Sequence, residues 1–298
     1  MSVDPALYIA EILGEPAAEM RNPANAEYQC PFINSECTKR AHGGTAGYPY
    51  PVCSAFQYQG RKVKTRRVVC LCPKRFFEVE ILPEVVKYCW PGKPPANPQY
   101  VHEIKMSHFG NVDFVIADIN KGGHVDQFVS VELQAVDTTG SIYPAYEALI
   151  TNQLLDEAPG YGFNLANVFK RYVTQLIRKG YFHHLWGTKI VSVIQDVVFD
   201  DIYKRTKFPE MKLEEANIVF MSYKFVPDEE KRRFVPVLDR VVGTHHNMLQ
   251  NAVLYQLAPS REKFCERIET QLKKGQAHFG KPDEINIAEE PEGEEPEE

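Results

Sequence analysis

The chain has 298 residues, 44% hydrophobic and 25% charged, so it can bury a large core as one big domain or two modest ones. No run approaches the roughly 20 apolar residues that a membrane helix needs, and the opening Met-Ser-Val-Asp-Pro lacks the pattern of a leader. We therefore expect a soluble, intracellular protein with no membrane partner. In a reducing compartment, its seven cysteines favour metal ligands or buried thiols over disulfides.

The net charge of −6 comes from the C-terminal tail, residues 282–298, which holds nine acidic residues and no Lys or Arg. Without it the chain has 34 basic and 31 acidic residues, a body charge near +3. The tail has almost nothing to bury, so we expect it to be acidic and disordered. The charge of the chain without this tail is compatible with DNA binding but does not favour it.

The N-terminal third opens with a predicted helix over residues 5–20. The stretch 30–98 then holds six of the seven cysteines together with many glycines and prolines, a composition typical of turns and short strands that need a staple. A proline-rich segment at 91–98 can be neither helix nor central strand. We therefore predict a metal-binding region over 1–98 and a core domain over 99–281.

The core domain begins with three predicted strands and continues with helices and a fourth strand. The predicted strands are His102–Phe109, Val112–Ile119, Phe128–Val136 and Lys189–Val198. The predicted helices are Ile142–Leu155, Asn164–Lys179 and Ser260–Lys274. A turn at 120–123 indicates a hairpin, Asn164 is expected to cap its helix, and Gly180 is expected to end it. Strands grouped with flanking helices indicate an α/β or α+β core.

Acidic residues interrupt two of the apolar strands. Asp113 lies in one, and Glu132 and Gln134 lie in the next, where strand alternation puts both on one face. Carboxylates in apolar strands are costly unless a partner or a cation compensates them. If the strands pair, Asp113 and Glu132 form a set of oxygen ligands that suits Mg²⁺. The alternative is that these acids only pair with Lys or Arg, and Asp118 is a rival first acid.

Five cysteines form a second constellation, with gaps of 6, 15, 16 and 1 residues: Cys30, Cys37, Cys53, Cys70 and Cys72. These gaps are not the short pairs of a zinc finger, but thiols gathered in a Gly-rich region still favour a metal. Tetrahedral sulfur suits zinc and iron alike, and four protein ligands indicate a structural role. Cys89 and Cys265 are expected to be buried apolar fillers.

The helix 164–179 carries a polar, basic stripe: Asn167, Lys170, Arg171, Thr174 and Arg178. Val168, Tyr172 and Leu176 lie on another face and are expected to pack in the core. The stripe is either a DNA-contacting surface or a solvated face, and a second basic cluster spans 61–67. The histidine pairs at 183–184 and 245–246 have no evident partner and are expected to be structural.

These motifs together resemble a known family. The acidic strands resemble the PD-(D/E)XK nuclease core, with Gln134 where the lysine usually stands, a variant found in the NotI and EagI restriction endonucleases. The likeness continues through Glu132–Ser141, the helix start Asn164–Arg171 and the cysteine segments around 30–39 and 72–75. It covers about residues 30–180 in the family's order, which is far more specific than any one motif.

The resemblance implies a Mg²⁺-dependent type II restriction endonuclease from the cytoplasm of a prokaryotic cell, acting as a homodimer on a GC-rich palindrome in double-stranded DNA. Asp113 and Glu132 would hold Mg²⁺, Gln134 would help to position the attacking water, and Glu103 resembles a further acid. Four thiolates would hold iron, and the resemblance favours Cys30, Cys37, Cys53 and Cys72, although Cys70 is an alternative to Cys72.

Two other hypotheses remain open at this stage. One is a nuclease with the same core that serves in repair or in a mobile element. The other is a metal-stapled DNA-binding protein whose acids only hold the fold together.

Overall fold

The computed structural model describes residues 2–20, 28–41, 47, 50–58, 66–107, 109–256 and 260–275. The chain divides into two compact units, Met1–Leu254 and Tyr255–Glu298. The second unit contains helix α7 (Arg261–Gly275), which confirms the last predicted helix. The predicted acidic tail, 282–298, lies outside the described residues. Within the described ranges, no helix is long and apolar enough to cross a membrane.

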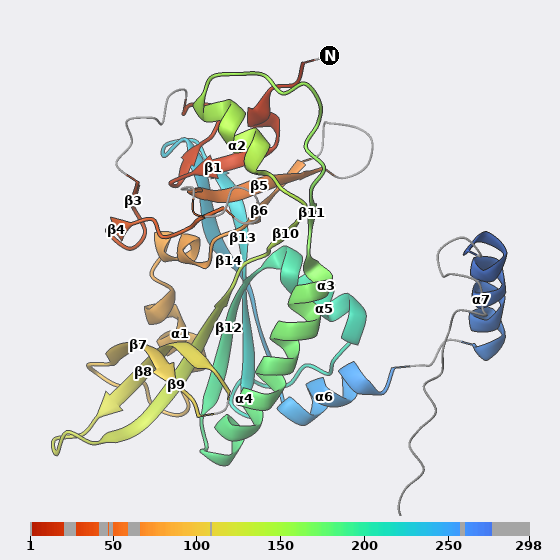
Figure 1. Ribbon diagram of the computed structural model, residues 1–298. Coiled ribbons are helices and arrows are strands. Elements are labelled where there is room, and N and C mark those ends of the chain that lie inside the picture. Colours follow the sequence, from red (N-terminus) through yellow and green to blue (C-terminus); the bar gives the residue numbers. More distant parts are fainter. Residues whose placement is uncertain are drawn as a thin grey trace, which may run out of the picture. The chain divides into compact units, whose positions relative to one another are not determined.

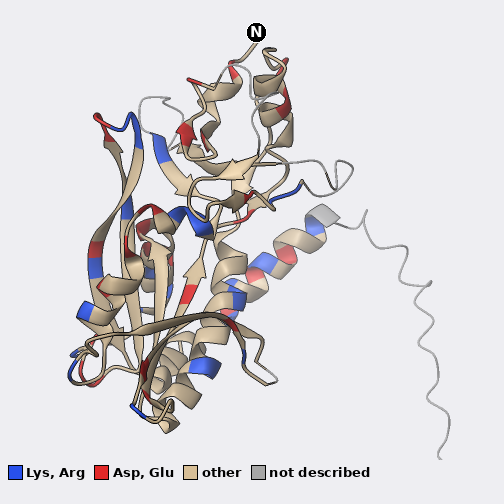
Figure 2. Cartoon of the chain, turned by 90° about the vertical axis from the view of Figure 1, so that its left-hand side faces the viewer, with Lys and Arg blue, Asp and Glu red and all other residues tan. Residues whose placement is uncertain are grey.

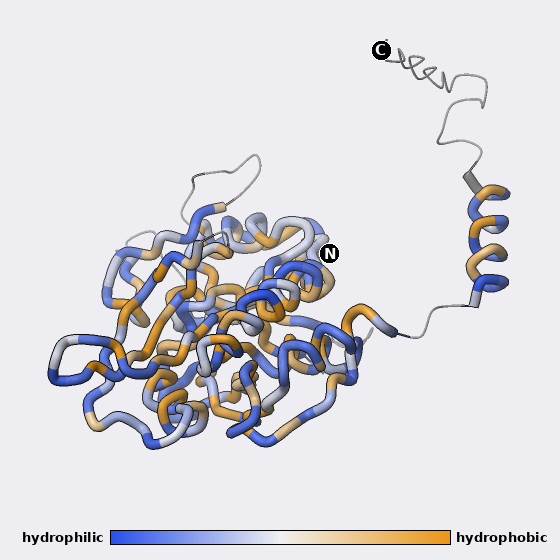
Figure 3. Tube along the Cα trace, turned by 90° about the horizontal axis from the view of Figure 1, so that it is seen from below, coloured by the Kyte–Doolittle hydropathy of each residue, from blue (hydrophilic) through white to orange (hydrophobic). Residues whose placement is uncertain are grey.

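A six-stranded mixed sheet forms the centre of the first unit (Figure 1). Its strands are β7 (Gln99–Lys105), β8 (Asn111–Ile119), β9 (Val125–Gln134), β12 (Lys189–Gln195), β13 (Ile218–Asp228) and β14 (Arg233–Thr244). The order across the sheet is β14-β13-β12-β9-β8-β7. Strands β9, β12 and β13 are parallel, and the outer pairs are antiparallel. Most of the buried apolar residues of the core lie in or against these strands, and Figure 3 shows apolar stretches (orange) alternating with polar ones (blue) along the trace.

Helices cover both faces of this sheet. One face packs on α3 (Leu165–Val168), the π-helical turn η5 (Phe169–Val173), α4 (Thr174–Leu185), α5 (Asp196–Thr206) and α6 (His246–Leu254). The other packs on the 3-10 helix η4 (Pro73–Glu78) and α1 (Ile81–Cys89). Strand β12 supplies Ile190 and Ile194 to the first core and Val191 and Val193 to the second, as strand alternation requires. The predicted α/β architecture, a mixed sheet flanked by helices, is confirmed.

A smaller sheet, in the order β2-β1-β5-β6, lies in the N-terminal third. Its strands are β1 (Ile9–Ile12), β2 (Glu15–Pro16), β5 (Val52–Tyr58) and β6 (Arg66–Cys70), and helix α2 (Tyr143–Ile150) packs against it. The short pairs β3 (Gln29–Cys30) with β4 (Ser35–Glu36) and β10 (Thr138–Thr139) with β11 (Gly162–Phe163) complete the strands.

The predicted helix over residues 5–20 is wrong. This segment forms the short 3-10 helix η1 (Pro5–Leu7) and then the hairpin β1–β2. The turn of that hairpin has Leu13 at φ 49° and Gly14 at φ 80°. Two successive residues with positive φ suit a tight hairpin turn and cannot continue a helix. Ile9 and Ile12 are buried because they pack in the small sheet.

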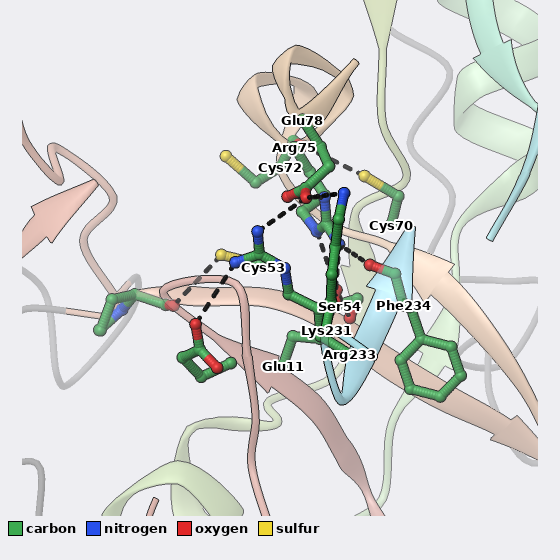
Figure 4. A network of polar contacts seen from close by, with 12 residues as sticks. Glu11, Cys53, Ser54, Cys70, Cys72, Arg75, Glu78, Lys231, Arg233 and Phe234 are labelled. Carbon is green, nitrogen blue, oxygen red and sulfur yellow. Dashed lines mark hydrogen bonds and ion pairs between the residues drawn. The ribbon is translucent and has the colours of Figure 1, made fainter. Parts of the chain in front are cut away.

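The proline-rich segment 91–98 is irregular and joins α1 to β7, and the residues on both sides of it belong to the same compact unit. The division into 1–98 and 99–281 therefore stays a prediction. A buried ion-pair network ties the small sheet to the long hairpin β13–β14 (Figure 4). In it, Arg75 Nη2 lies 2.8 Å from Glu11 Oε1, and Arg233 Nη2 lies 2.8 Å from Glu78 Oε1.

The hairpin predicted at 120–123 is confirmed, because the Asn120 side chain accepts hydrogen bonds from Gly122 N and His124 N. The strand predicted to reach residue 198 ends at Gln195, where α5 begins. The long hairpin β13–β14 was not recognised in the sequence.

Asn164 caps its helix as predicted, since its side chain accepts a hydrogen bond from Asn167 N. Gly180, however, does not end the helix, which continues to Leu185. A Cβ at Gly180 would lie 2.7 Å from Ile218 Cδ1, so this glycine permits close packing of α4 on β13 instead. Gly187, at φ 64°, follows the helix end.

Candidate functional site

The two acids predicted to share a site lie opposite each other on neighbouring strands. The β8–β9 register pairs Phe114 with Val131, so the next residues along, Asp113 and Glu132, face each other across the two strands. Asp113 Oδ2 accepts a hydrogen bond of 2.8 Å from Leu133 N, which fixes its carboxylate against β9. Asp113 is half-buried and Glu132 is buried.

Glu103 and Asp118 differ in how they relate to this pair. The β7–β8 pairs on either side of Glu103 place it opposite Asp113. Glu132, Asp113 and Glu103 therefore form a row that ends at the edge strand β7, and we call it the acidic row. Glu103 is exposed and has φ 56°, an unusual backbone conformation for a glutamate. Asp118 pairs with Gln127, further along the hairpin, and so does not lie beside Glu132.

A buried lysine that the sequence analysis did not single out contacts the acidic row. Lys179 on α4 forms an ion pair with the Glu132 carboxylate, and its Nζ also donates a hydrogen bond of 2.6 Å to Asn111 O. The Lys179 residue is only 3% exposed. The signal was its spacing, because it follows the buried Tyr172 and Leu176 by seven and three residues on the apolar face of the helix.

Burial dominates the electrostatics of this row. It raises the pKa of Glu132 to about 7, against the opposing effect of the Lys179 hydrogen bond and charge. Burial also raises the pKa of Asp113, and the negative charge of Glu103 raises it further. When both carboxylates are ionised, the single charge of Lys179 does not balance them. Two carboxylates on one sheet face, with one negative charge left uncompensated, are a donor set that suits Mg²⁺.

Gln134 lies two residues beyond Glu132 and therefore on the same face of β9. Its side-chain amide donates a hydrogen bond to Ala135 O. It lines a polar hollow of about 160 Å³ together with Asp137, Asn167 and Arg171. A neighbouring hollow of about 540 Å³ shares Asp137 and Asn167 with it.

The larger hollow is also lined by basic side chains of the cysteine region, Lys39 and Arg40. A polar path therefore leads from Gln134 to that region. Asp137 does not cap the following helix: α2 is preceded by Ile142 and has no side-chain cap, although Ser141 Oγ accepts a hydrogen bond from Tyr143 N.

The structure does not bring the four predicted DNA-contacting residues together. Asn167 and Arg171 line the hollow beside Gln134. Lys170 is exposed, and the Arg178 guanidinium lies 4.7 Å from the Phe109 ring centre in a different hollow. The π-helical turn η5 explains the split, because its wider winding shifts the residues after it relative to an uninterrupted α-helix.

The second basic cluster is only partly described, since residues 61–65 lie outside the described residues. Arg67 Nη2 lies 2.6 Å from Asp196 Oδ2, so this arginine forms an ion pair within the protein. In the view of Figure 2, basic and acidic residues are interspersed over the chain and do not form one broad basic band.

The predicted metal-binding cysteines are gathered at one end of the small sheet but do not close around one point. Lys39 lies among them, since the charges of Cys37, Cys53, Cys70 and Cys72 all act on its ammonium. Within the described residues, no three cysteine sulfurs lie within 4.8 Å of one another. Four sulfurs on one tetrahedral ion would be roughly 3.8 Å apart. The donor types therefore fit a thiolate-bound metal, and the separations do not.

The two alternatives for the fourth thiol differ in their surroundings. Cys70 is fully buried in the core beneath α1, and its Sγ donates a hydrogen bond of 3.1 Å to Cys72 O. Cys72 is half-buried, and the charges of Lys39, Cys37 and Cys30 act on it. Burial raises the pKa of both thiols. Cys72 is the one that faces the other predicted ligands.

Comparison with known proteins gives one family. The family model described as restriction endonuclease NotI matches residues 12–235. A comparison with curated proteins returned no match. The family match covers the acidic row, Gln134 and the cysteines from Cys30 to Cys72. Because it extends over well more than half of the sequence, this chain belongs to the NotI family of restriction endonucleases.

Proposed function

We propose that this protein is a type II restriction endonuclease that hydrolyses phosphodiester bonds of double-stranded DNA at a specific site with Mg²⁺. Its family membership supports DNA cleavage by a restriction enzyme. The observation that carries the proposed centre is the β8–β9 register, which sets Asp113 opposite Glu132 on one sheet face beside the single ammonium of Lys179.

In this proposal Asp113 and Glu132 hold Mg²⁺, and exposed Glu103 adds a carboxylate at the open side of the row. The bound ion supplies activation of water and neutralisation of charge on the phosphate. The N–H of Leu133 orients Asp113, and Lys179 orients Glu132. Such fixed orientation of ligands by their neighbours is what a site needs in order to be ready before substrate arrives.

Gln134 stands where the wider nuclease superfamily has a lysine, and an amide brings no charge. Lys179 offers a replacement from a different element, because it places a buried ammonium on the carboxylate two residues before Gln134. We assign Gln134 to positioning the attacking water and Lys179 to compensating negative charge in the row. Lys179→Met should weaken cleavage and alter Mg²⁺ affinity, and Lys179→Arg should restore part of both.

Asn167 and Arg171 are the proposed contacts to the DNA backbone nearest the site, since they line the hollow that Gln134 also lines. Lys170 and Arg178 are proposed as more distant contacts. A two-fold homodimer would match a palindromic, GC-rich site. Sedimentation of the protein with and without a palindromic duplex tests the dimer.

The decisive experiment is digestion of a DNA of known sequence, followed by mapping of the ends. With Mg²⁺ we expect discrete fragments with one common end sequence, and with EDTA no cleavage. Glu132→Gln should bind the DNA without cutting it, and Asp118→Asn, on the same strand pair but away from the row, should cut normally. A random smear would favour a repair or mobile-element nuclease, and intact DNA with full binding would favour a non-catalytic protein.

We also propose a structural iron or zinc ion held by Cys30, Cys37, Cys53 and Cys72 within the region 1–98. Cys30 and Cys53 lie in β3 and β5, Cys37 follows β4 and Cys72 precedes η4, and binding of an ion would draw the thiols closer and expel their protons. Elemental analysis of purified protein separates iron from zinc. Cys72→Ser should lose the ion and Cys70→Ser should keep it; the reverse result would make Cys70 the fourth ligand.

A further inference from the structure

Three histidines meet where α4 ends and α6 begins. His184 lies in the last turn of α4, His245 follows β14, and His246 opens α6. One ring nitrogen from each lies within 4.8 Å of the other two. The proposed nuclease reaction uses none of them, and sequence analysis expected them to be structural.

The separation of two of these nitrogens suits a shared metal ion. His184 Nδ1 and His245 Nε2 are 3.2 Å apart. Two imidazole nitrogens bound to one tetrahedral zinc ion, each about 2.05 Å from it, would be roughly 3.3 Å apart. The ion could therefore enter between these two rings with little movement. His184 is exposed and His245 is half-buried, so the path from solvent is open.

His245 is also held as metal-bound histidines usually are. Its other ring nitrogen, Nδ1, is 2.6 Å from Asn247 Oδ1. A carbonyl oxygen accepts a hydrogen bond, so Nδ1 carries the proton and Nε2 presents a lone pair toward His184. A hydrogen bond on the second nitrogen that fixes tautomer and ring orientation is a general property of histidine ligands.

His246 supplies an independent observation. Its Nδ1 is buried and has no hydrogen-bond partner among the described residues. Its backbone N donates to Asn217 Oδ1 at 3.0 Å, and Asn217 Nδ2 donates to Gly180 O at 2.5 Å. The ring is thus held against α4 by its own main chain.

We infer that His184, His245 and His246 form a binding site for a transition-metal cation of the zinc class. Three imidazoles bind Zn²⁺ or Ni²⁺ in preference to Mg²⁺, so this site is chemically distinct from the acidic row. It leaves a fourth position for water. The ion fastens the end of α4, the helix that carries Lys179, to the junction of β14 and α6.

The first test counts zinc in the full-length protein. Wild type, His184→Ala, His245→Ala and His124→Ala are equilibrated with ZnCl₂, dialysed and analysed for zinc per chain. His124 is an exposed histidine in the β8–β9 turn and serves as the matched control. We expect His184→Ala and His245→Ala to lose about one zinc per chain and His124→Ala to lose none. Equal zinc in all four proteins would overturn the inference.

The proposed cysteine site would also take up zinc, so the test compares the zinc content of each variant with that of wild type. A second measurement guards against misfolding: far-UV circular dichroism of each variant before zinc is added, and hydrogen exchange of residues 181–186 with and without zinc. Wild type should show slower exchange there with zinc, and folded His184→Ala should show no change. Unchanged exchange in wild type would mean that the three rings only pack against each other.

Discussion

Two clusters of buried charged residues in this molecule differ in how fully their carboxylates are paired with basic side chains. In the small sheet, the buried Arg75 guanidinium contacts both Glu11 and Glu78, and Arg233 also contacts Glu78. Ser54 donates a further hydrogen bond to Glu11. In the large sheet, by contrast, one buried ammonium faces a row of carboxylates.

The difference teaches how to tell a structural cluster from a functional one. A network in which every carboxylate oxygen has a partner is complete, and adding a cation to it would gain nothing. When Asp113 and Glu132 are both ionised, they keep a net negative charge beside Lys179, which costs free energy unless an ion is bound. A buried acidic residue does not by itself indicate function. A buried acidic residue without enough basic partners does.

The largest expected effect is the loss of DNA cleavage when a carboxylate of the acidic row is removed. Asp113→Asn keeps the side-chain shape but removes a charge, so cleavage should fall by about 10²–10³-fold or more while the melting temperature changes little. Single-turnover cleavage with Mg²⁺ and thermal unfolding of the same sample check it. A large loss of stability with normal cleavage would make Asp113 structural.

The next largest expected effect is on the free energy of unfolding, through the fully paired network of Glu11, Arg75 and Glu78. Glu11→Ala leaves the buried Arg75 with Glu78 as its remaining ion-pair partner, so the free energy of unfolding should fall by up to about 3–5 kcal/mol. Urea unfolding measures this loss, with the slope of the free energy of unfolding against urea concentration the same in both proteins. Cleavage per folded molecule should stay near the wild-type rate, and a specific loss of cleavage in the folded fraction would show that the two clusters are not separate in role.

A smaller effect concerns pH. The Glu132 pKa of about 7 lies above its ordinary value of 4.5, so the folded protein binds a proton there that the unfolded chain has lost. This group therefore favours the folded state at low pH, and its contribution is lost as pH rises from about 4.5 through 7. Metal binding has the opposite sign, since the cation needs the ionised carboxylate.

Apparent Mg²⁺ affinity should consequently fall by up to about tenfold per pH unit below 7. Calorimetric titration at pH 6, 7 and 8 without DNA measures this change. An affinity that is flat over this range would mean that Glu132 is already ionised or does not bind the ion.

The smallest effect separates the residues of the basic helix. Arg171→Ala removes a cation beside Gln134 and should lower the slope of DNA affinity against salt by about one unit. Arg178→Ala, whose guanidinium lies over Phe109, is the matched control and should change the slope less. Equal changes in both variants would place the DNA along the whole helix.

The sequence was informative where local periodicity carries the structure. The strands around Asp113 and Glu132 and the Asn120 turn follow from alternation and turn chemistry, and the structure agrees with them. The face shared by Glu132 and Gln134 also follows from alternation alone. Their neighbourhood is local in sequence, because a tight hairpin connects the two strands.

Prediction from the sequence failed where packing between distant segments determines the structure. Gly180 has the signature of a helix stop, but it is needed for contact with Ile218 on another strand. The position of Lys179 on the apolar face of its helix indicates burial, but its partner Glu132 lies 47 residues earlier and does not follow from that spacing. The approach of the histidines at 184 and 245–246 likewise depends on how α4 and α6 pack, which no spacing reveals.

The π-helical turn η5 sets the phase of everything after it on this helix. Each residue of an α-helix turns the chain by about 100°. If Phe169–Val173 took up ordinary α-helical winding at the same length, the downstream half would swing by about a quarter of a circle, carrying Lys179 away from Glu132. An insertion of one residue, kept as a wide turn, is what allows a helix and a strand to meet in register here.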